Sequence, residues 1–289
     1  LTVDMYYPAD MHTPRPTIFF ISGWKLYHSE AYYSLLYFIA SQGYNAVFVS
    51  YKGTDAEQNG FIKSILQTVV ADPRFSDKID TSKVGFMGHS MGAGILFHLA
   101  QGLKGWGTKG RFLFPMAGAT AYFQTQQLIE LPANTKMIVQ TYNERENDRD
   151  INWDTDPRFS IDYLINTNIS DADKTYLYLP GDTQHISSHD TPKSRYDNGN
   201  FYYDALQQVG IFRPLESLMR YTFDNDTDWK HIGLPDSDPD MRETNGIQFY
   251  SGDNPYVDLD IADDPSGGYK FGFNDAEYNP DRQDYCCQP

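Results

Sequence analysis

The chain is short of the features that mark several large classes of protein. Only two of its 289 residues are cysteines, and because Cys286 and Cys287 are adjacent they cannot form a disulfide framework. No run of about 18 apolar residues occurs, so the sequence predicts no transmembrane helix. Basic residues number 23 against 39 acidic ones. The resulting net charge of -16 argues against nucleic acid or an anionic membrane as a partner, because both attract basic patches.

The composition that remains is typical of a folded protein. Hydrophobic residues make up 40% of the chain and aromatic residues 15%, which is enough for a sizeable core. The length fits one large α/β domain or two smaller ones. The first residues, Leu1-Thr2-Val3-Asp4, read as a strand and include neither a signal peptide nor an initiator Met, as in a processed mature chain or a trimmed one. We expect a monomer in a secreted or periplasmic location.

Up to residue 222, apolar runs alternate with amphipathic segments. The runs predict strands at residues 17–22, 46–50, 83–87, 111–116, 137–141 and 175–179. Helices are predicted at residues 29–41, 57–71, 93–101 and 202–220. In the first of these Ser29 is the expected cap and Gly43 the stop, and in the last Pro214 is expected to interrupt the helix. Such alternation is typical of an α/β fold with a mostly parallel sheet, helices on both faces and functional groups at the carboxyl ends of the strands.

One segment points directly to a reaction. Residues 84–94 read VGFMGHSMGAG, in which Gly88-His89-Ser90-Met91-Gly92 is a G-x-S-x-G motif between a predicted strand and a predicted helix. This is the setting of a nucleophile elbow, a sharp turn that holds a serine on strained backbone with its hydroxyl exposed. Glycines at both ends avoid the clash that a Cβ would cause. The motif therefore predicts acyl transfer through a serine ester.

A serine nucleophile needs a histidine base and a carboxylate, and in this arrangement both follow the serine along the chain. After the strand at 175–179 the sequence continues PGDTQHISSH, which offers His185 and, four residues later, His189. We favour His185 because of its distance from the strand end. After the strand at 137–141 comes YNERENDRD, in which Glu144 is the favoured acid and Asp148 the alternative.

The negative oxygen of a tetrahedral intermediate needs preorganised N–H donors. The backbone N–H of Met91, the residue after the nucleophile, is one candidate. The other is the N–H of Trp24 in the loop Ile21-Ser22-Gly23-Trp24, where Gly23 lets the backbone turn towards the serine. The Trp24 side chain would then form a wall of the acyl pocket.

Together these segments resemble the α/β-hydrolase superfamily, and within it the bacterial cutinase and polyester-hydrolase group. The resemblance covers residues 1–222 and rests on VGFMGHSMGAG, FFISGWK and TYLYLPGDTQH. It implies an α/β-hydrolase catalytic domain in which Ser90 is the nucleophile, His185 the base, and Trp24 and Met91 the oxyanion donors. It places the acid near Glu144, although that family normally has an Asp in a shorter loop.

The activity that the resemblance implies is cleavage of carboxylic esters, small or polymeric, through an acyl-enzyme. Polyester cleavage is less directly implied, because the family tends to place a tryptophan after the strand RFLFP and this chain has Met116-Ala117-Gly118-Ala119. A serine peptidase and an acyltransferase on the same fold remain alternatives, since fold does not determine the acyl acceptor. A non-catalytic protein with this fold would be expected to lack one member of the triad.

The last 67 residues, 223–289, differ in composition. They hold fourteen Asp, two Glu and four Lys or Arg, so that -12 of the net charge lies there. We expect them to form an acidic extension, rich in Asp, Asn and Gly, that packs on the catalytic domain through aromatic residues. The alternating Asp224, Asp226 and Asp228 suggest a Ca²⁺ site, but Trp229 stands where an EF-hand loop requires glycine. No cofactor and no catalytic metal are expected.

Overall fold

The computed structural model describes residues 2–51, 57–118, 129–142, 167–179 and 187–230, with residues 234, 243–244, 247–248 and 250–251 beyond them. Their centre is an eight-stranded sheet with the order β1-β3-β2-β4-β5-β6-β7-β12. The two edge strands β1 and β12 are antiparallel to their neighbours, and the other pairings are parallel. The bounds are β1 (Val3–Tyr6), β2 (Arg15–Ile21), β3 (Asn45–Val49), β4 (Ile79–His89), β5 (Gly110–Met116), β6 (Thr135–Tyr142), β7 (Lys174–Leu179) and β12 (Tyr250–Ser251).

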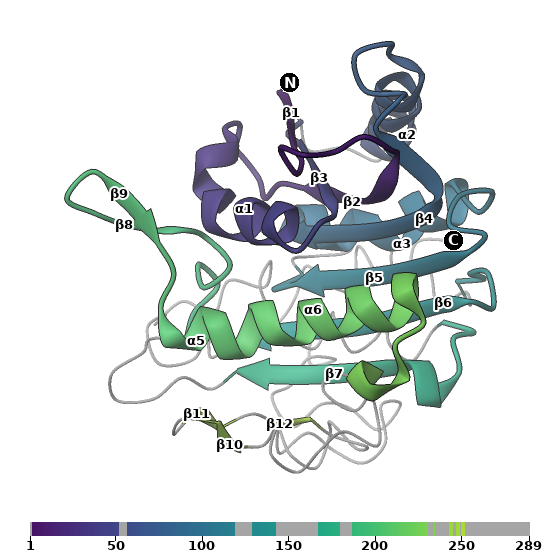
Figure 1. Ribbon diagram of the computed structural model, residues 1–289. Coiled ribbons are helices and arrows are strands. Elements are labelled where there is room, and N and C mark those ends of the chain that lie inside the picture. The colour runs from purple at the N-terminus through teal and green to yellow at the C-terminus, as the bar shows by residue number, and fades with distance from the viewer. Residues whose placement is uncertain are drawn as a thin grey trace.

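Helices cover both faces of this sheet (Figure 1). One face packs against α1 (Tyr33–Ser41) and α6 (Arg213–Met219), whose Leu35, Leu36, Leu215 and Leu218 belong to one core cluster. The other face packs against α2 (Glu57–Ala71) and α3 (Met91–Gly102), whose Ile62, Leu66, Ile95 and Leu96 belong to a second cluster. Because the central strands are covered on both faces, their sequences are continuous apolar runs, as in β2 and β3.

The predicted α/β architecture is confirmed at this level: a mostly parallel sheet with helices on both faces. Each of the six predicted strands is present, and α2 has the predicted bounds. The cap at Ser29 was wrong. Residues Ser29–Tyr32 form a 3-10 turn (η1) whose N-cap is His28, and the Ser29 hydroxyl donates to the Asp4 carboxylate at 2.6 Å. Gly43 does end α1, with the positive φ of 92° that favours glycine.

The predicted helix at residues 202–220 differs in its start and its middle. Tyr202 ends β9 (Asn200–Tyr202), which pairs with β8 (Arg195–Asp197) in a hairpin, and the helix starts at α5 (Ala205–Gln207) because Asp204 caps it. Pro214 does not break it. A π-helical turn, η4 (Gln208–Phe212), precedes α6, and the Gln140 amide donates to the Gly210 carbonyl, which would accept from residue 214 in a regular helix. A second π-turn, η5 (Arg220–Asp224), follows α6.

The described chain continues past the predicted boundary at residue 222. Phe223 is fully buried against Tyr44 and Phe112, and a 3-10 turn, η6 (Thr227–Trp229), follows it. Short pieces beyond form β10 (Glu243–Thr244) and β11 (Ile247–Gln248), and η3 (Asp171–Asp173) precedes β7. The division into a catalytic domain and an acidic extension stays a prediction. None of the helices in the described part combines the length and apolar character needed to cross a bilayer.

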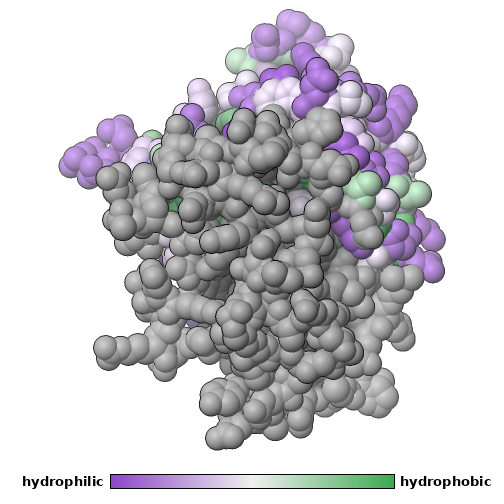
Figure 2. All heavy atoms as spheres, turned by 90° about the horizontal axis from the view of Figure 1, so that it is seen from below, coloured by the Kyte–Doolittle hydropathy of each residue, from purple (hydrophilic) through white to green (hydrophobic). Residues whose placement is uncertain are grey.

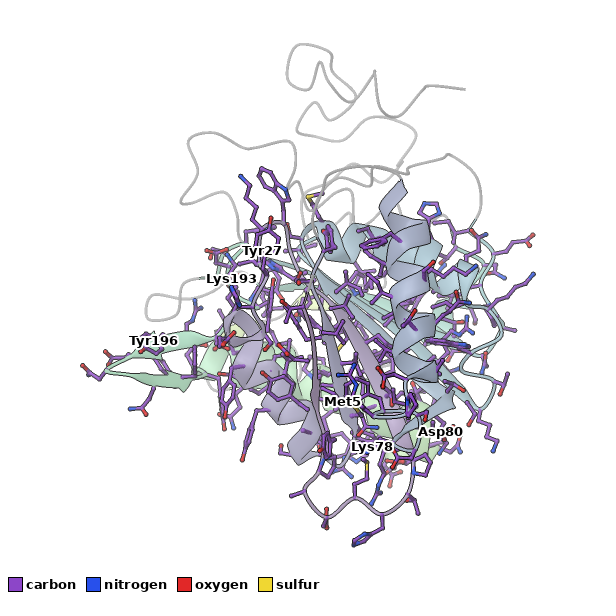
Figure 3. All side chains as sticks on the ribbon, turned by 90° about the horizontal axis from the view of Figure 1, so that it is seen from above. Met5, Tyr27, Lys78, Asp80, Lys193 and Tyr196 are labelled. Atoms are coloured by element: carbon purple, nitrogen blue, oxygen red, sulfur yellow. The ribbon has the colours of Figure 1, made fainter. Side chains whose placement is uncertain are left out.

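The two ends of the strands lie on opposite sides of the molecule. In Figure 3, Tyr27 and Lys193, which follow the ends of β2 and β7, lie on the upper side, whereas Lys78 and Asp80, at the start of β4, lie on the lower side. The hairpin β8–β9 projects from the body, with Tyr196 on it (Figure 3). Seen from below, the described surface around the rim is mostly hydrophilic with small hydrophobic areas (Figure 2). Groups that follow β2, β4, β6 and β7 therefore start from one edge of the sheet.

A buried arginine fixes the end of α3 against the sheet. Arg111 of β5 is fully buried, and its guanidinium donates to the carbonyls of Ala100, Leu103, Lys104 and Trp106. It has no acidic partner among the described residues. These carbonyls lie at or just after the C-terminus of α3, where backbone acceptors have no helical partner and a cation is favourable. Burial lowers the pKa of Arg111 to about 10, so it remains charged at neutral pH.

Replacing this guanidinium should cost stability. Arg111→Met removes the side-chain donor from the Ala100, Lys104 and Trp106 carbonyls, and we expect the free energy of unfolding to fall by about 3 kcal/mol. Arg74→Met is the matched control, because Arg74 pairs with Asp72 on the surface. Chemical denaturation of both variants checks this expectation: the control should keep the wild-type midpoint, and an equally small effect at Arg111 would show that the cap is dispensable.

Candidate active site

The predicted strand–turn–helix context of Ser90 is confirmed. β4 ends at His89, α3 begins at Met91, and Ser90 between them has φ 57° and ψ -126°. Such a backbone conformation costs of order 1–3 kcal/mol for a residue with a side chain, and it persists only where the surroundings impose it. Here the Ser90 N–H donates to the Met116 carbonyl at the end of β5, and the Ser90 carbonyl accepts from Ala93 and Gly94. Ser90 retains 9% exposure.

The two glycines of the motif are required by contact distance. A Cβ at Gly92 would lie 2.3 Å from the Ile21 carbonyl oxygen and 2.5 Å from that of Ser22. A Cβ at Gly88 would lie 2.6 Å from the Gly92 carbonyl carbon. Without these side chains, the first turn of α3 packs directly on the end of β2. The loop that carries Trp24 is thereby held beside the serine.

The two predicted oxyanion donors lie on either side of this contact. Met91 is the first residue of α3, so its N–H has no acceptor within the helix. Trp24 lies in a turn closed by the hydrogen bond from the Leu26 N–H to the Gly23 carbonyl, and Lys25 in that turn has φ 61°. No acceptor is recorded for the Trp24 N–H within the described ranges. The Trp24 side chain is 49% exposed, and the Lys25 ammonium lies 3.9 Å from its ring centroid.

Two of the predicted triad residues lie outside the described residues. Glu144 and its alternative Asp148 follow β6, which ends at Tyr142, and His185 follows β7, which ends at Leu179. Ser187, the next described residue after Leu179, donates its hydroxyl to the Leu179 carbonyl at 2.5 Å. The residues on either side of the His185 segment are thus joined by a hydrogen bond at the carboxyl end of β7. This is the edge of the sheet at which Ser90 lies.

His189, the alternative base, is placed close to the elbow. Its ring centroid lies 4.7 Å from that of His89, the residue before Ser90. The segment around it is tied to two helical elements: the Gln207 amide donates to the Thr191 and Lys193 carbonyls, and the Ser194 N–H donates to the Ala31 carbonyl. The ring contact places His189 beside the elbow, whereas His185 lies outside the described residues.

The sequence pattern assigned no role to a buried pair that meets at this edge, Tyr32 and His89. Tyr32 is 0% exposed and His89 1%. The Gly23 N–H donates to the Tyr32 hydroxyl at 3.1 Å, and that hydroxyl lies 2.7 Å from His89 Nδ1. His89 Nε2 lies 2.8 Å from the His189 carbonyl oxygen. The network assigns the tautomer, because a carbonyl can only accept: Nε2 carries the hydrogen, and Nδ1 accepts from Tyr32.

Burial sets the charge of both groups. Desolvation holds the pKa of His89 well below its usual value, with the neighbouring His189 and Lys193 charges acting in the same direction. Burial also raises the pKa of Tyr32, so its hydroxyl keeps its proton. Both groups are neutral at physiological pH, and each supplies one donor and one acceptor to the network.

The Ca²⁺ site suggested for the tail gains no support from the residues that are placed. Asp224 accepts from the Tyr44 hydroxyl at 2.6 Å, and the Asp226 carboxylate caps η6. In the described part of the chain no group of three or more His, Cys, Asp or Glu is arranged to hold a metal ion. The further aspartates Asp236, Asp238 and Asp240 lie outside the described residues, as do Cys286 and Cys287.

Comparison with known proteins adds no relative. None of the models of known protein families matches the chain. No curated protein is similar enough to be matched. What the site does must therefore be argued from its own residues.

The neutral His89 predicts a pH dependence of stability. On acidification through about pH 6.5 the unfolded chain takes up a proton at His89, whereas the folded chain, with its lowered pKa, does not. The unfolded state binds more protons, so stability falls below that pH by up to about 1.4 kcal/mol per unit. In His89→Gln the loss between about pH 7 and pH 5 should shrink by about 2 kcal/mol.

Denaturation of wild type and variant at the two pH values measures this difference. His12→Gln is the control, since His12 is exposed in the connection between β1 and β2. It should retain the pH dependence of the wild type. An unchanged dependence in His89→Gln would mean that His89 is protonated in the folded protein.

Proposed function

We propose that this protein is a serine hydrolase of the α/β-hydrolase fold that cleaves carboxylic esters through an acyl-enzyme intermediate. The observation that carries the proposal is the backbone of Ser90, a non-glycine residue with φ 57° and ψ -126° at the junction of β4 and α3. A serine at an ordinary strand–helix connection has no reason to adopt this conformation. A nucleophile elbow requires it, because the turn raises the hydroxyl above the sheet edge.

The order of the strands supports the fold assignment. β4 is central, β6 and β7 follow on one side of it, and all three are parallel. In α/β hydrolases the acid and the histidine follow the serine in chain order at the carboxyl ends of later strands. Glu144 or Asp148 after β6, and His185 or His189 after β7, fit that order.

In the proposed reaction, Ser90 Oγ attacks the ester carbonyl carbon and its proton passes to the histidine. The carbonyl oxygen becomes negative and accepts from the N–H groups of Met91 and Trp24. Collapse breaks the bond to the alcohol, which leaves with the proton, and Ser90 remains acylated. Water then attacks with the same histidine as base, releasing the acid and restoring Ser90. The half-exposed Trp24 ring offers an apolar face for the acyl group.

The first prediction for this function concerns Ser90. Ser90→Ala should lower kcat for short-chain nitrophenyl esters by about 10⁴-fold or more, because no other group supplies the nucleophile. Ser217→Ala is the matched control: Ser217 lies in α6, is fully buried, and donates its hydroxyl to the Trp229 carbonyl. The control should hydrolyse the ester at the wild-type rate. Full activity in Ser90→Ala would remove the proposal.

The second prediction identifies the partners of Ser90. We expect Glu144→Gln to reduce kcat by about 10⁴-fold and Asp148→Asn to leave it nearly unchanged, because only the carboxylate that orients the histidine is needed. Likewise His185→Gln should abolish turnover and His189→Gln should not. Steady-state kinetics of the four variants identify the acid and the base. If the reverse pattern is found within a pair, the role belongs to the alternative residue.

A further inference from the structure

A chain of buried hydrogen bonds joins three segments that are distant in sequence. Gly23 N–H donates to the Tyr32 hydroxyl, that hydroxyl donates to His89 Nδ1, and His89 Nε2–H donates to the His189 carbonyl. Tyr32 and His89 are 57 residues apart, and His89 and His189 are 100 apart. The link is therefore tertiary. It connects the loop after β2, the end of β4 and the segment after β7.

Each of the three segments carries a group of the proposed reaction. Gly23 precedes Trp24, a proposed oxyanion donor, and His89 precedes Ser90, the proposed nucleophile. His189 lies in the segment that follows His185 and is anchored by Ser187 to the end of β7. The network thus touches the backbone beside the groups that react. Its two side chains, Tyr32 and His89, are neither members of the proposed triad nor proposed oxyanion donors, and His189 takes part only through its backbone carbonyl.

The packing around the network is tight at Gly23. A Cβ at Gly23 would lie 3.2 Å from His89 Nδ1 and 3.3 Å from the Tyr32 hydroxyl. The Tyr32 ring is held by Phe20, with centroids 4.5 Å apart, and by Phe48 at 6.2 Å. Aromatic packing therefore fixes the position of the Tyr32 hydroxyl. This hydroxyl in turn orients the Gly23 N–H that donates to it.

We propose that Tyr32 and His89 are positioning residues that hold the oxyanion loop in register with Ser90, through the hydrogen bonds to Gly23 and His189. This inference rests on the proposed function. Its physical basis is that an oxyanion donor is effective only within a few tenths of an ångström of its place, and that it gains most of its value in the transition state. A residue with this role should affect kcat much more than KM.

Tyr32→Phe tests the inference with little change in packing. The ring stays between Phe20 and Phe48, while the Gly23 N–H loses its acceptor and His89 Nδ1 loses its donor. The expected result with a nitrophenyl ester is a fall in kcat of about 10- to 100-fold with KM within about threefold of the wild type. Affinity for a trifluoromethyl ketone, which forms a tetrahedral adduct with an active serine, should fall by the same factor as kcat/KM.

Tyr44→Phe is the matched control. Tyr44 is 6% exposed, and its hydroxyl donates to Asp224 at 2.6 Å beside the start of β3, at the opposite edge of the sheet. Tyr44→Phe also removes the hydroxyl of a buried tyrosine, here one that donates to a carboxylate, so both variants should lose stability in thermal melts. Only Tyr32→Phe should lose kcat. A loss of kcat that is equal in the two variants, or absent in Tyr32→Phe, would overturn the inference.

His89→Gln provides a second variant should Tyr32→Phe not fold. A glutamine amide can still donate towards His189 but does not reach both partners of the imidazole, and kcat should again fall with KM nearly unchanged. Wild-type kcat in this variant would contradict the inference. Failure of the proposed function gives a different result: wild type would then not hydrolyse the ester, or Ser90→Ala would retain the activity, and the inference would fall with it.

Discussion

The site depends on the close approach of α3 to the end of β2. Gly92 in the first turn of α3 lies so near the Ile21 and Ser22 carbonyls that a Cβ would be 2.3 Å from the nearer one. This contact fixes where the helix begins. Because β4 ends at His89 and α3 begins at Met91, Ser90 alone makes the turn between them, with φ 57° and ψ -126°. The strain is maintained by hydrogen bonds to Met116, Ala93 and Gly94, and it is the strongest indication that Ser90 reacts.

The contact at Gly92 does not by itself orient the loop after β2, and a buried hydrogen-bond network does so. Packing by Gly92 brings the loop after β2 beside the serine but does not fix the direction of its N–H groups. The buried hydroxyl of Tyr32 supplies that direction by accepting from Gly23, and His89 extends the link to the segment at His189. Both side chains are neutral because burial disfavours their charged forms. Each side-chain donor and acceptor in the network has a hydrogen-bond partner, and this is the condition under which a buried polar network rigidifies a site.

Features that depend on neighbours in sequence were predictable, and features that depend on tertiary contacts were not. Six strands of the sheet followed from continuous apolar runs, and the elbow from the spacing of Gly88, Ser90 and Gly92, whereas the short strands β8 and β9 were not predicted. The Ser29 cap was wrong because Asp4, 25 residues away, takes its hydroxyl. The sequence does contain a signal for the start of the last helix, because Asp204 and Gln207 have capping-box spacing. The Tyr32–His89 pair could not be foreseen, because it requires that η1 and the end of β4 converge at one sheet edge.

The central claim is that Ser90 is an activated nucleophile, and covalent labelling tests it most directly. The protein is incubated with a fluorophosphonate at neutral pH, and intact mass and peptide mapping then locate the adduct. The account predicts one equivalent of label, on the peptide that contains Ser90, since only an activated serine beside oxyanion donors displaces fluoride readily. A folded protein that takes up no label, or takes it up on another residue, would contradict the account.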